Sequence, residues 1–333
     1  MRKGKQTYVF ENGVYLLSGA SIVGEKEGQG PLKNYFDVVL QEDSWGEDSF
    51  EKAERKMFRT ALETAKLNAK LTNDDIDLVI GGDLLNQIIS ATFAARELQT
   101  AFLGVYGACS TICESILLAS CLIDGGFANN VLCGASSHFS TAERQYRFPL
   151  EYGSQPTPTS QWTVTGAGSS LISSTPSDIC VRAATAGKII DLGIKDANNM
   201  GAAMAPAAAD TICAFLRETE TKPEDYDLII TGDLGSLGKE LAIELIGQEG
   251  YDVSRVFSDC GCMMFYPGQT APMGASGCGC AATVFNGAIR KDMLSGKLKN
   301  VLLAATGAML SPTSAFQGEN IPGISYAVNF TRC

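Results

Sequence analysis

The residue of this chain best suited to chemistry is a cysteine at a predicted strand–helix junction. Cys109 lies in residues 107–110 (GACS), after an apolar strand and before an apolar helix. At a helix start a thiol faces free backbone N–H groups and the positive end of the helix dipole, which lower its pKa. The same position also attracts anions. The sequence therefore predicts a nucleophile or an anion-binding wall at Cys109 and Ser110, with a small buried core thiol as the alternative.

A duplicated pattern supplies the scaffold for this junction. Residues 77–84 (DLVIGGDL) reappear as residues 227–234 (DLIITGDL), an offset of 150 (227 − 77). Each copy is a short β-branched run ending in Gly-Asp, which indicates a buried strand and then a turn. Residues 131–136 (VLCGAS) are echoed by residues 301–306 (VLLAAT), an offset of 170 (301 − 131). The difference predicts about twenty extra residues in the second copy, between positions 250 and 275.

Helical patterns alternate with these strands and define the fold class. They occupy residues 48–69, 109–124, 204–219 and 280–294. The alternation predicts two pseudo-symmetric α/β lobes, with mixed sheets layered between helices. We assign residues 1–178 to the first half, which carries Cys109, and residues 179–333 to the second. Residues 161–174 and 179–193 are predicted to form a strand pair that joins the halves.

Polar residues follow several of the predicted strands. Asp83 and Asp233 occupy the same place in the repeat, and we interpret each as the cap of the helix after its strand. The alternative for Asp233 is a direct role in a pocket. His138 follows strand 131–136 and could approach Cys109, because the two strands would lie side by side. It opens the segment 137–160, which is polar and longer than a usual connection, as functional loops often are.

Composition and charge exclude several classes of function. The chain has 333 residues, a net charge of −11 and 45% hydrophobic residues, which fit a globular protein. An acidic chain is a poor partner for nucleic acid or an anionic membrane surface. We find no signal peptide, and no run reaches the ~18 apolar residues of a membrane span. Any membrane location is therefore expected to come through a partner.

The cysteines are spread through apolar runs. There are 11 of them, and without a secretion signal they are expected to be reduced and buried. Two C-x-C pairs, 260–262 and 278–280, could bind zinc or an iron–sulfur cluster, but their spacing is shorter than the usual C-x₂₋₄-C. We therefore predict no metal site, and small thiols in glycine-rich turns instead.

Several of these segments resemble the thiolase superfamily of acyl-condensing enzymes. The resemblance rests on the duplicated lobes, the GACS helix start, residues 131–135 (VLCGA), 165–170 (TGAGSS) and 274–277 (GASG). A stage V sporulation branch of that superfamily matches more closely, over essentially the whole chain. Its most specific segments are residues 141–149 (TAERQYRFP), 151–155 (EYGSQ), 161–166 (QWTVTG) and 231–235 (TGDLG).

The resemblance implies a thiolase-like fold and binding of dipicolinic acid, with or without calcium. It further implies work with the other stage V A-group sporulation membrane proteins, in loading dipicolinate into the developing spore and releasing it at germination. The protein would then be peripheral on the spore inner membrane, held there through partners. A homodimer is common in this superfamily.

The groups needed for condensation are missing from the expected places. Enzymes of the superfamily use a general base, normally His, and a second His or Asn for the oxyanion, both from loops of the second half. The single histidine, His138, lies in the first half, and the corresponding second-half segments are 231–233 (TGD) and 273–278 (MGASGC). Because a placed base contributes about 10²–10⁴-fold, we predict a binding protein without catalysis. The alternative is an acyl-condensing enzyme or acyltransferase with Cys109 as nucleophile and His138 as base.

A flat dicarboxylate would need cationic forks, N–H groups and an apolar slot. Arg144 and Arg147 are three apart and would share a helix face; surface ion pairs with glutamates are the alternative. The other candidates for hydrogen bonding or stacking are His138, Gln145, Tyr146, Gln161, Thr163, Thr165 and Asp233, with Cys109 and Ser110 at the helix start.

Overall fold

The computed structural model describes residues 1–146 and 156–333. Its main sheet contains two sets of five strands, one from each half of the chain. In spatial order the first set is β3 (Tyr15–Val23), β9 (Gly166–Ser173), β7 (Asn130–Ser137), β5 (Leu78–Asp83) and β6 (Phe102–Gly104). The second set is β10 (Ile179–Ala186), β15 (Gly323–Arg332), β14 (Asn300–Ala308), β11 (Leu228–Thr231) and β12 (Phe257–Asp259).

The two sets repeat the same strand directions. In each, the first three strands are antiparallel and the last three parallel. The sets meet where β3 and β10 pair antiparallel, at Tyr15 and Cys180. The predicted fold class, two pseudo-symmetric lobes with mixed sheets, is confirmed. The predicted pairing of residues 161–174 with 179–193 is wrong, because β3 lies between β9 and β10 and hydrogen-bonds to both.

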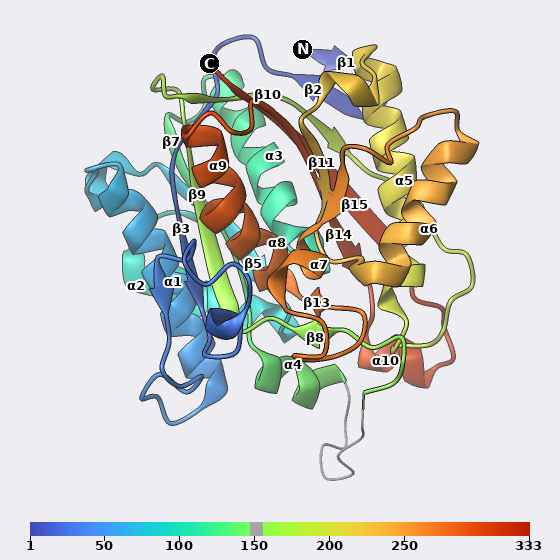
Figure 1. Ribbon diagram of the computed structural model, residues 1–333. Helices are drawn as coiled ribbons and strands as arrows, with labels where there is room; N and C mark the ends of the chain where they lie inside the picture. The colour runs from blue at the N-terminus through green and yellow to red at the C-terminus, as the bar shows by residue number, and fades with distance from the viewer. Residues whose placement is uncertain (147–155) are drawn as a thin grey trace.

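Helices cover both faces of the sheets. The outer helices are α1 (Phe50–Asn68) and α2 (Ile89–Leu98) in the first half, and α5 (Met200–Thr219) and α6 (Gly235–Gln248) in the second. Between the two sets run α3 (Thr111–Asp124), α8 (Cys278–Val284) and α9 (Arg290–Leu294), the last two joined by a π-helical turn over Phe285–Ile289. Figure 1 shows this order, with α3, α8 and α9 in the middle of the molecule.

The central position of α3 follows from its sequence. Its body is apolar on nearly every side, and Ile112, Ile116 and Ala119 are fully buried. It contacts strands of both sets, including β5, β7, β14 and β15. The start of this helix is therefore held rigidly at the boundary between the two halves, which is where Cys109 lies.

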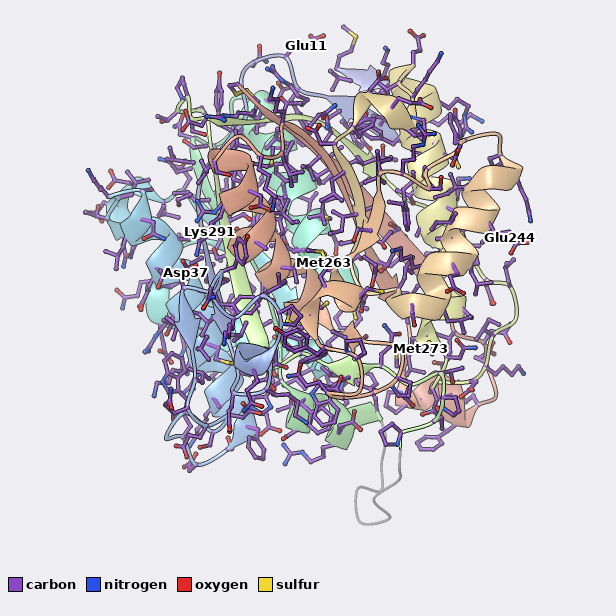
Figure 2. All side chains as sticks on the ribbon, in the orientation of Figure 1. Glu11, Asp37, Glu244, Met263, Met273 and Lys291 are labelled. Carbon is purple, nitrogen blue, oxygen red and sulfur yellow. A yellow bond between two sulfur atoms is a disulfide. The ribbon has the colours of Figure 1, made fainter. Side chains whose placement is uncertain are left out.

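Short elements complete the described part of the chain. They are β1 (Arg2–Lys3), β2 (Thr7–Val9), β4 (Val38–Val39), α4 (Phe139–Tyr146), β8 (Trp162–Thr163), α7 (Cys260–Met264), β13 (Ala275–Ser276) and α10 (Pro312–Phe316). The loop before α1 is tied to the central helices by an ion pair between Asp37 and Lys291, 3.0 Å apart, which lie close together in Figure 2. β8 and β13 pair in parallel and bring the two halves together near Cys109.

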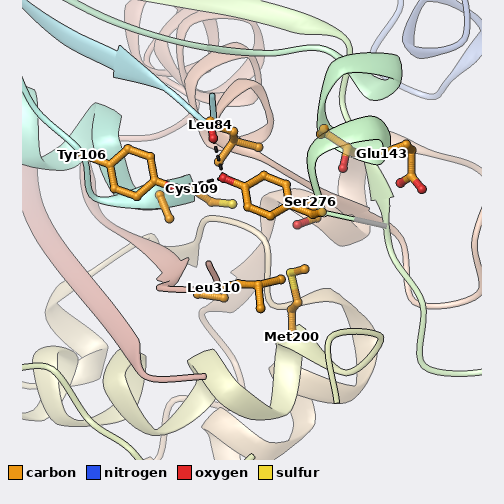
Figure 3. A pocket seen from close by; sticks show the side chains of 12 residues that line it. Leu84, Tyr106, Cys109, Glu143, Met200, Ser276 and Leu310 are labelled. Atoms are coloured by element: carbon orange, nitrogen blue, oxygen red, sulfur yellow. Dashed lines mark hydrogen bonds between the residues drawn. The ribbon is translucent and has the colours of Figure 1, made fainter. Parts of the chain in front are cut away.

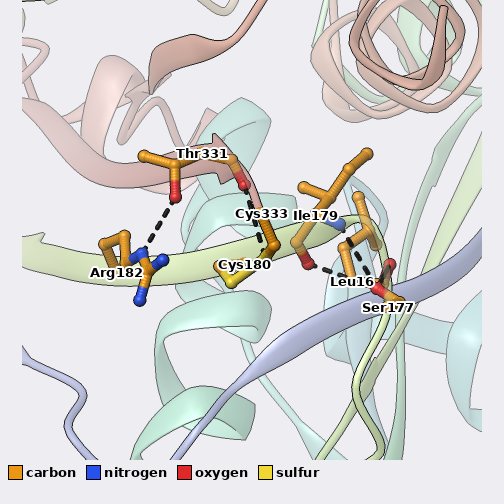
Figure 4. The surroundings of a disulfide bond; sticks show 7 residues. All are labelled: Leu16, Ser177, Ile179, Cys180, Arg182, Thr331 and Cys333. Carbon is orange, nitrogen blue, oxygen red and sulfur yellow. Dashed lines mark hydrogen bonds between the residues drawn. A yellow bond between two sulfur atoms is a disulfide. The ribbon is translucent and has the colours of Figure 1, made fainter. Parts of the chain in front are cut away.

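One disulfide corrects the expectation of a fully reduced chain. Cys180 at the start of β10 is bonded to Cys333, one residue beyond the end of β15 (Figure 4). The two strands are antiparallel neighbours, so their ends meet although 153 residues separate the cysteines. The remaining nine cysteines are free, and seven of those nine are buried, as predicted.

Candidate functional site

A strained turn presents Cys109 at the start of α3. Ala108 has a φ of +49°, a left-handed conformation that residues other than glycine adopt rarely. Its carbonyl oxygen accepts hydrogen bonds from Thr111 Oγ1 (2.7 Å) and from Cys278 Sγ (2.8 Å). Because Cys278 belongs to the second half, these bonds hold the Cys109 turn against the other lobe.

Cys109 borders a cavity between the two halves. The empty volume is about 460 Å³, with the open mouth included. The lining residues are Leu84, Tyr106, Ala108, Cys109, Ala142, Glu143, Tyr146, Thr163, Met200, Ser276, Ala308 and Leu310. Figure 3 shows Cys109 between Tyr106 and Ser276, with Met200 and Leu310 on the opposite wall. The walls are mainly apolar, and two tyrosine rings provide flat surfaces for an aromatic ligand.

The thiol of Cys109 is paired with a carboxylate. The carboxylate is that of Asp233, two positions after the end of β11, and it lies close enough to oppose ionisation of the thiol. Burial, together with the negative charge of Asp233 and the neighbouring Cys278, raises the pKa of Cys109 well above its ordinary value. The sequence predicted the opposite shift from the helix start. Burial is the largest cause of the rise, so the predicted lowering of the Cys109 pKa does not hold.

Asp233 is built into this site and does not cap a helix. Its carboxylate accepts hydrogen bonds from Thr306 Oγ1 (2.8 Å), Ser276 Oγ (2.9 Å) and the Gly277 N–H (3.0 Å). Gly277 has a φ of +101°, and a Cβ there would lie 2.7 Å from Ser137 Oγ, so glycine is needed to present that N–H. Burial raises the pKa of Asp233 to about 6.

The cap interpretation holds for one repeat and fails for the other. Asp83 accepts from the N–H groups of Leu85 (2.8 Å) and Ala91 (2.7 Å), at the beginning of α2. In the second half Asp259 takes this role, accepting from the Leu234 and Gly235 N–H groups at the start of α6. Asp233 is therefore not needed as the cap of α6, and its carboxylate faces Cys109.

His138 is buried, and its hydrogen-bond partners lie outside the cavity lining. Its Nδ1 accepts from the Ser140 N–H (3.1 Å), so its Nε2 carries the proton and donates to the Asp43 carbonyl oxygen (3.0 Å). Burial lowers the pKa of His138, which favours the neutral ring. His138 is absent from the cavity lining, so the structure does not bring it together with Cys109.

The predicted cationic fork is not found at the cavity. Arg144 in α4 forms an ion pair with Glu51 of α1, and its side chain is 54% exposed. Gln145 donates to the Leu84 carbonyl oxygen (2.9 Å) and accepts from the Asn86 N–H (3.0 Å). Neither residue lines the cavity. Arg147 lies outside the described residues.

Of the remaining predicted site residues, one lines the cavity and the others form hydrogen bonds behind its wall. Thr163 lines the cavity. Gln161 donates to the carbonyl oxygens of Asp233 (2.7 Å) and Ala275 (2.9 Å) and so supports the wall. Ser110 donates to the Gly107 carbonyl oxygen (2.6 Å), and Thr165 accepts from the Phe139 N–H (3.2 Å).

Sequence reasoning missed several wall residues. Tyr106, Met200, Ser276 and Leu310 come from four separate segments of the chain. Ser276 lies inside a glycine-rich motif that the sequence singled out, which was a usable signal. The others follow ordinary strands or begin a helix, and only the folded arrangement brings them together.

The prediction that the two C-x-C pairs lie in glycine-rich turns is wrong, because each pair opens a short helix, Cys260 and Cys262 in α7 and Cys278 and Cys280 in α8. Cys278 Sγ bonds to Ala108, as described, and Cys280 Sγ donates to the Gly232 carbonyl oxygen (3.3 Å). Within residues 1–146 and 156–333 no cluster of three or more His, Cys, Asp or Glu side chains has a geometry that could hold a metal ion.

Comparison with known proteins assigns the family. The family model for Stage V sporulation protein AD (SpoVAD) matches residues 4–331. The chain belongs to the SpoVAD family. The Stage V sporulation protein AD of Bacillus subtilis (strain 168) is 46% identical over 329 residues, which cover 99% of this chain and 97% of that protein.

Solved structures show which fold the SpoVAD family shares. A single-residue variant of OleA from Xanthomonas campestris superposes with a TM-score of 0.66 at 13% identity, over 99% of both chains. The 3-oxoacyl-[acyl-carrier-protein] synthase III of Aquifex aeolicus VF5 gives 0.56 at 16%, covering 98% of this chain and all of that one. Human mitochondrial 3-ketoacyl-CoA thiolase gives 0.60 at 12%, covering 99% of this chain and all of that one. The SpoVAD chain therefore has the thiolase-like fold of these enzymes. No helix among its described residues has the length and apolarity needed to cross a membrane.

Proposed function

We propose that this protein binds dipicolinic acid without catalysing a reaction, for uptake into the developing spore and release at germination. The observation that carries the proposal is the pairing of Cys109 with Asp233 at the cavity between the halves. A buried thiol beside a carboxylate stays protonated at neutral pH, so it serves as a weak hydrogen-bond donor and not as a nucleophile. Membership of a sporulation family supports the same interpretation.

The cavity offers a flat slot with a donor at its edge. The rings of Tyr106 and Tyr146 give the ligand's pyridine ring apolar surfaces to contact. The hydroxyl of Thr163 is a donor for a carboxylate. Arg144 has no part in this arrangement, because it pairs with Glu51.

The alternative function is acyl condensation or acyl transfer, with Cys109 as the nucleophile. The thiolase-like fold is that of enzymes and is the observation in its favour. Against it stand the raised pKa of Cys109 and the engagement of His138 with Asp43. Acylation of Cys109 by a thioester donor, detected by mass spectrometry, would establish this function in place of ligand binding.

The proposed partners are the other stage V A-group membrane proteins, with the protein held peripherally at the spore inner membrane. We propose that any calcium enters with dipicolinate as its chelate. A second copy of the chain is also proposed as a partner. The edge strand β6, which pairs with β5 and exposes Leu103, offers it a place to add.

Calorimetric titration with dipicolinate tests the proposal, with pyridine-2-carboxylate as the control ligand. We expect saturable binding that is selective for the dicarboxylate. Thr163→Val removes a wall donor and should weaken binding about tenfold. Arg144→Ala, whose side chain lies outside the cavity, should leave the affinity within about twofold. Absence of heat and of thermal stabilisation in the wild-type protein would refute the proposal.

A further inference from the structure

Two tyrosines separate the Cys109 cavity from a second hollow. Tyr106 and Tyr146 line both spaces. The second space, the outer cleft, has an empty volume of about 670 Å³ with open solvent included. Its lining residues are Leu85, Asn86, Gln87, Tyr106, Tyr146, Met309, Leu310, Ser311 and Pro312. Leu310 also lines both, so the two spaces are neighbours across the tyrosine pair and this leucine.

A chain of hydrogen bonds holds the pair closed. The Tyr106 and Tyr146 hydroxyl oxygens lie 2.9 Å apart. Tyr146 donates its one hydroxyl hydrogen to the Leu84 carbonyl oxygen, so Tyr106 must donate to Tyr146. Figure 3 shows these bonds as dashed lines above the Cys109 side chain. Loss of the Tyr146 hydroxyl would remove both bonds and leave the rings in place.

The segment that accepts this bond is strained. Gln87 and Ile88 both have left-handed backbone conformations, with φ of +56° and +47°, and a β-branched residue such as Ile88 rarely adopts one. Ile88 is held there by packing over Gly82 and Gly104 of the sheet. Strain of this kind concentrates at ligand clamps and switches.

The chemistry of the outer cleft suits a flat anion. Its polar lining consists of the amides of Asn86 and Gln87 and the hydroxyls of Ser311 and the two tyrosines. The Asn86 and Gln87 amides and the Ser311 hydroxyl can donate hydrogen bonds to carboxylates, and no Asp or Glu is among the lining residues that the structure describes.

We propose that the outer cleft is a second binding compartment for a flat aromatic acid, and that the Tyr106–Tyr146 pair is the gate between it and Cys109. The identity of the ligand as dipicolinate rests on the proposed function, whereas the gate does not. The ligand enters the outer cleft, the hydroxyl pair opens, and the ligand passes to the inner cavity.

Alkylation of Cys109 measures the gate without any ligand. Folded protein is treated with N-ethylmaleimide at fixed pH, and each cysteine is followed by peptide mass spectrometry, with Cys121 at the far end of α3 as the internal reference. Tyr146→Phe should alkylate Cys109 about tenfold faster, and Tyr106→Phe should also be faster, with Cys121 unchanged. Tyr266→Phe, an exposed tyrosine away from both spaces, is the matched control. Unchanged Cys109 rates in both gate variants would overturn the gate.

Filling the outer cleft tests the route. In the Tyr146→Phe background, Ser311→Trp should slow alkylation of Cys109 at least about threefold, whereas Thr313→Trp, which lies outside the lining, should not. An equal rate for both would overturn the outer compartment. Dipicolinate association should be faster in Tyr146→Phe and slower in Ser311→Trp. A further outcome is that dipicolinate binds none of these proteins while Cys109 alkylation still changes as expected in the gate and cleft variants. That result would support the gate and refute the proposed function.

Discussion

At the scale of single residues, Asp233 helps to keep the thiol of Cys109 protonated. A carboxylate next to a buried thiol opposes ionisation of that thiol, because two negative charges would then share a site of low polarity. The same carboxylate orders the wall by accepting from Ser276, Gly277 and Thr306. One residue thus suppresses reactivity and organises the cavity.

Asp233→Asn should therefore make Cys109 more reactive. Removing the charge lowers the pKa of Cys109, and we expect its alkylation at pH 8 to rise about tenfold, which corresponds to about one pKa unit. Thr306→Val, which removes a hydrogen bond to Asp233 and keeps the charge, is the control. Equal Cys109 reactivity in Asp233→Asn and the wild type would show that the carboxylate does not govern the thiol.

The sequence predicted where Cys109 lies but not what faces it. A strand, a small-residue turn and an apolar helix are local patterns, so the position of Cys109 at the start of α3 could be predicted directly. The direction of the Asp233 side chain depends on Asp259, which occupies the cap that Asp233 would otherwise fill. The pairing of Arg144 with Glu51 likewise joins residues distant in sequence. Such competition between distant residues leaves no local signal.

At the scale of elements, Asp259 starts two helices at once. Its carboxylate accepts from the Leu234 and Gly235 N–H groups at the start of α6 and from the Cys262 N–H of α7, as well as from the Thr231 hydroxyl. The side chain is fully buried, so none of these donors can turn to water. The elements that carry Asp233 and support β13 therefore depend on this one residue.

Asp259→Ala should cost about 2–4 kcal/mol of unfolding free energy, since several buried donors lose their partner. Ser49→Ala removes the single cap of α1, a bond of 3.3 Å to the Lys52 N–H, and should cost about 1 kcal/mol. Urea unfolding of the two variants measures the difference. A loss for Asp259→Ala no greater than that for Ser49→Ala would contradict this role.

At the scale of the whole molecule, buried carboxyl groups couple stability to pH. Burial raises the pKa of Glu27 to about 8 and that of Glu54 to about 8, and Glu54 is also faced by Asp83, Ser136 and Thr141. An acid whose pKa is higher in the folded protein holds its proton there more tightly than in the unfolded chain. Such a group contributes its full share to the free energy of unfolding below pH 4.5, the pKa of the acid in the unfolded chain. That share is lost as the pH rises towards about 8, the pKa in the folded protein.

The melting temperature should therefore fall as the pH rises from about 5.5 to 8.5. Glu54→Gln mimics the protonated acid and should reduce that fall, while Glu244→Gln, on the solvent-facing side of α6 (Figure 2), should leave it unchanged. Thermal melts across this range check the prediction. A melting temperature that rises with pH in the wild type would show that the sign is wrong.

Cys333→Ser tests the bond between the ends of β10 and β15. Opening a loop of 153 residues should lower the unfolding free energy by about 2–5 kcal/mol. Cys121→Ser, at a free and partly exposed cysteine, is the control for the substitution itself. Equal stability of Cys333→Ser and the oxidised wild type would mean that the bond adds nothing.

The same bond gives the chain an unusual topology. Because it joins the first strand of the second half to Cys333, residues 180–333 form a closed covalent ring, and the first half leads into it as a linear segment. A processive unfoldase pulling from the N-terminus would thread that segment as a single strand. On reaching Cys180 it would have to admit two strands together or wait for a reductant. Degradation of the oxidised protein should then stall and leave a fragment of the second half.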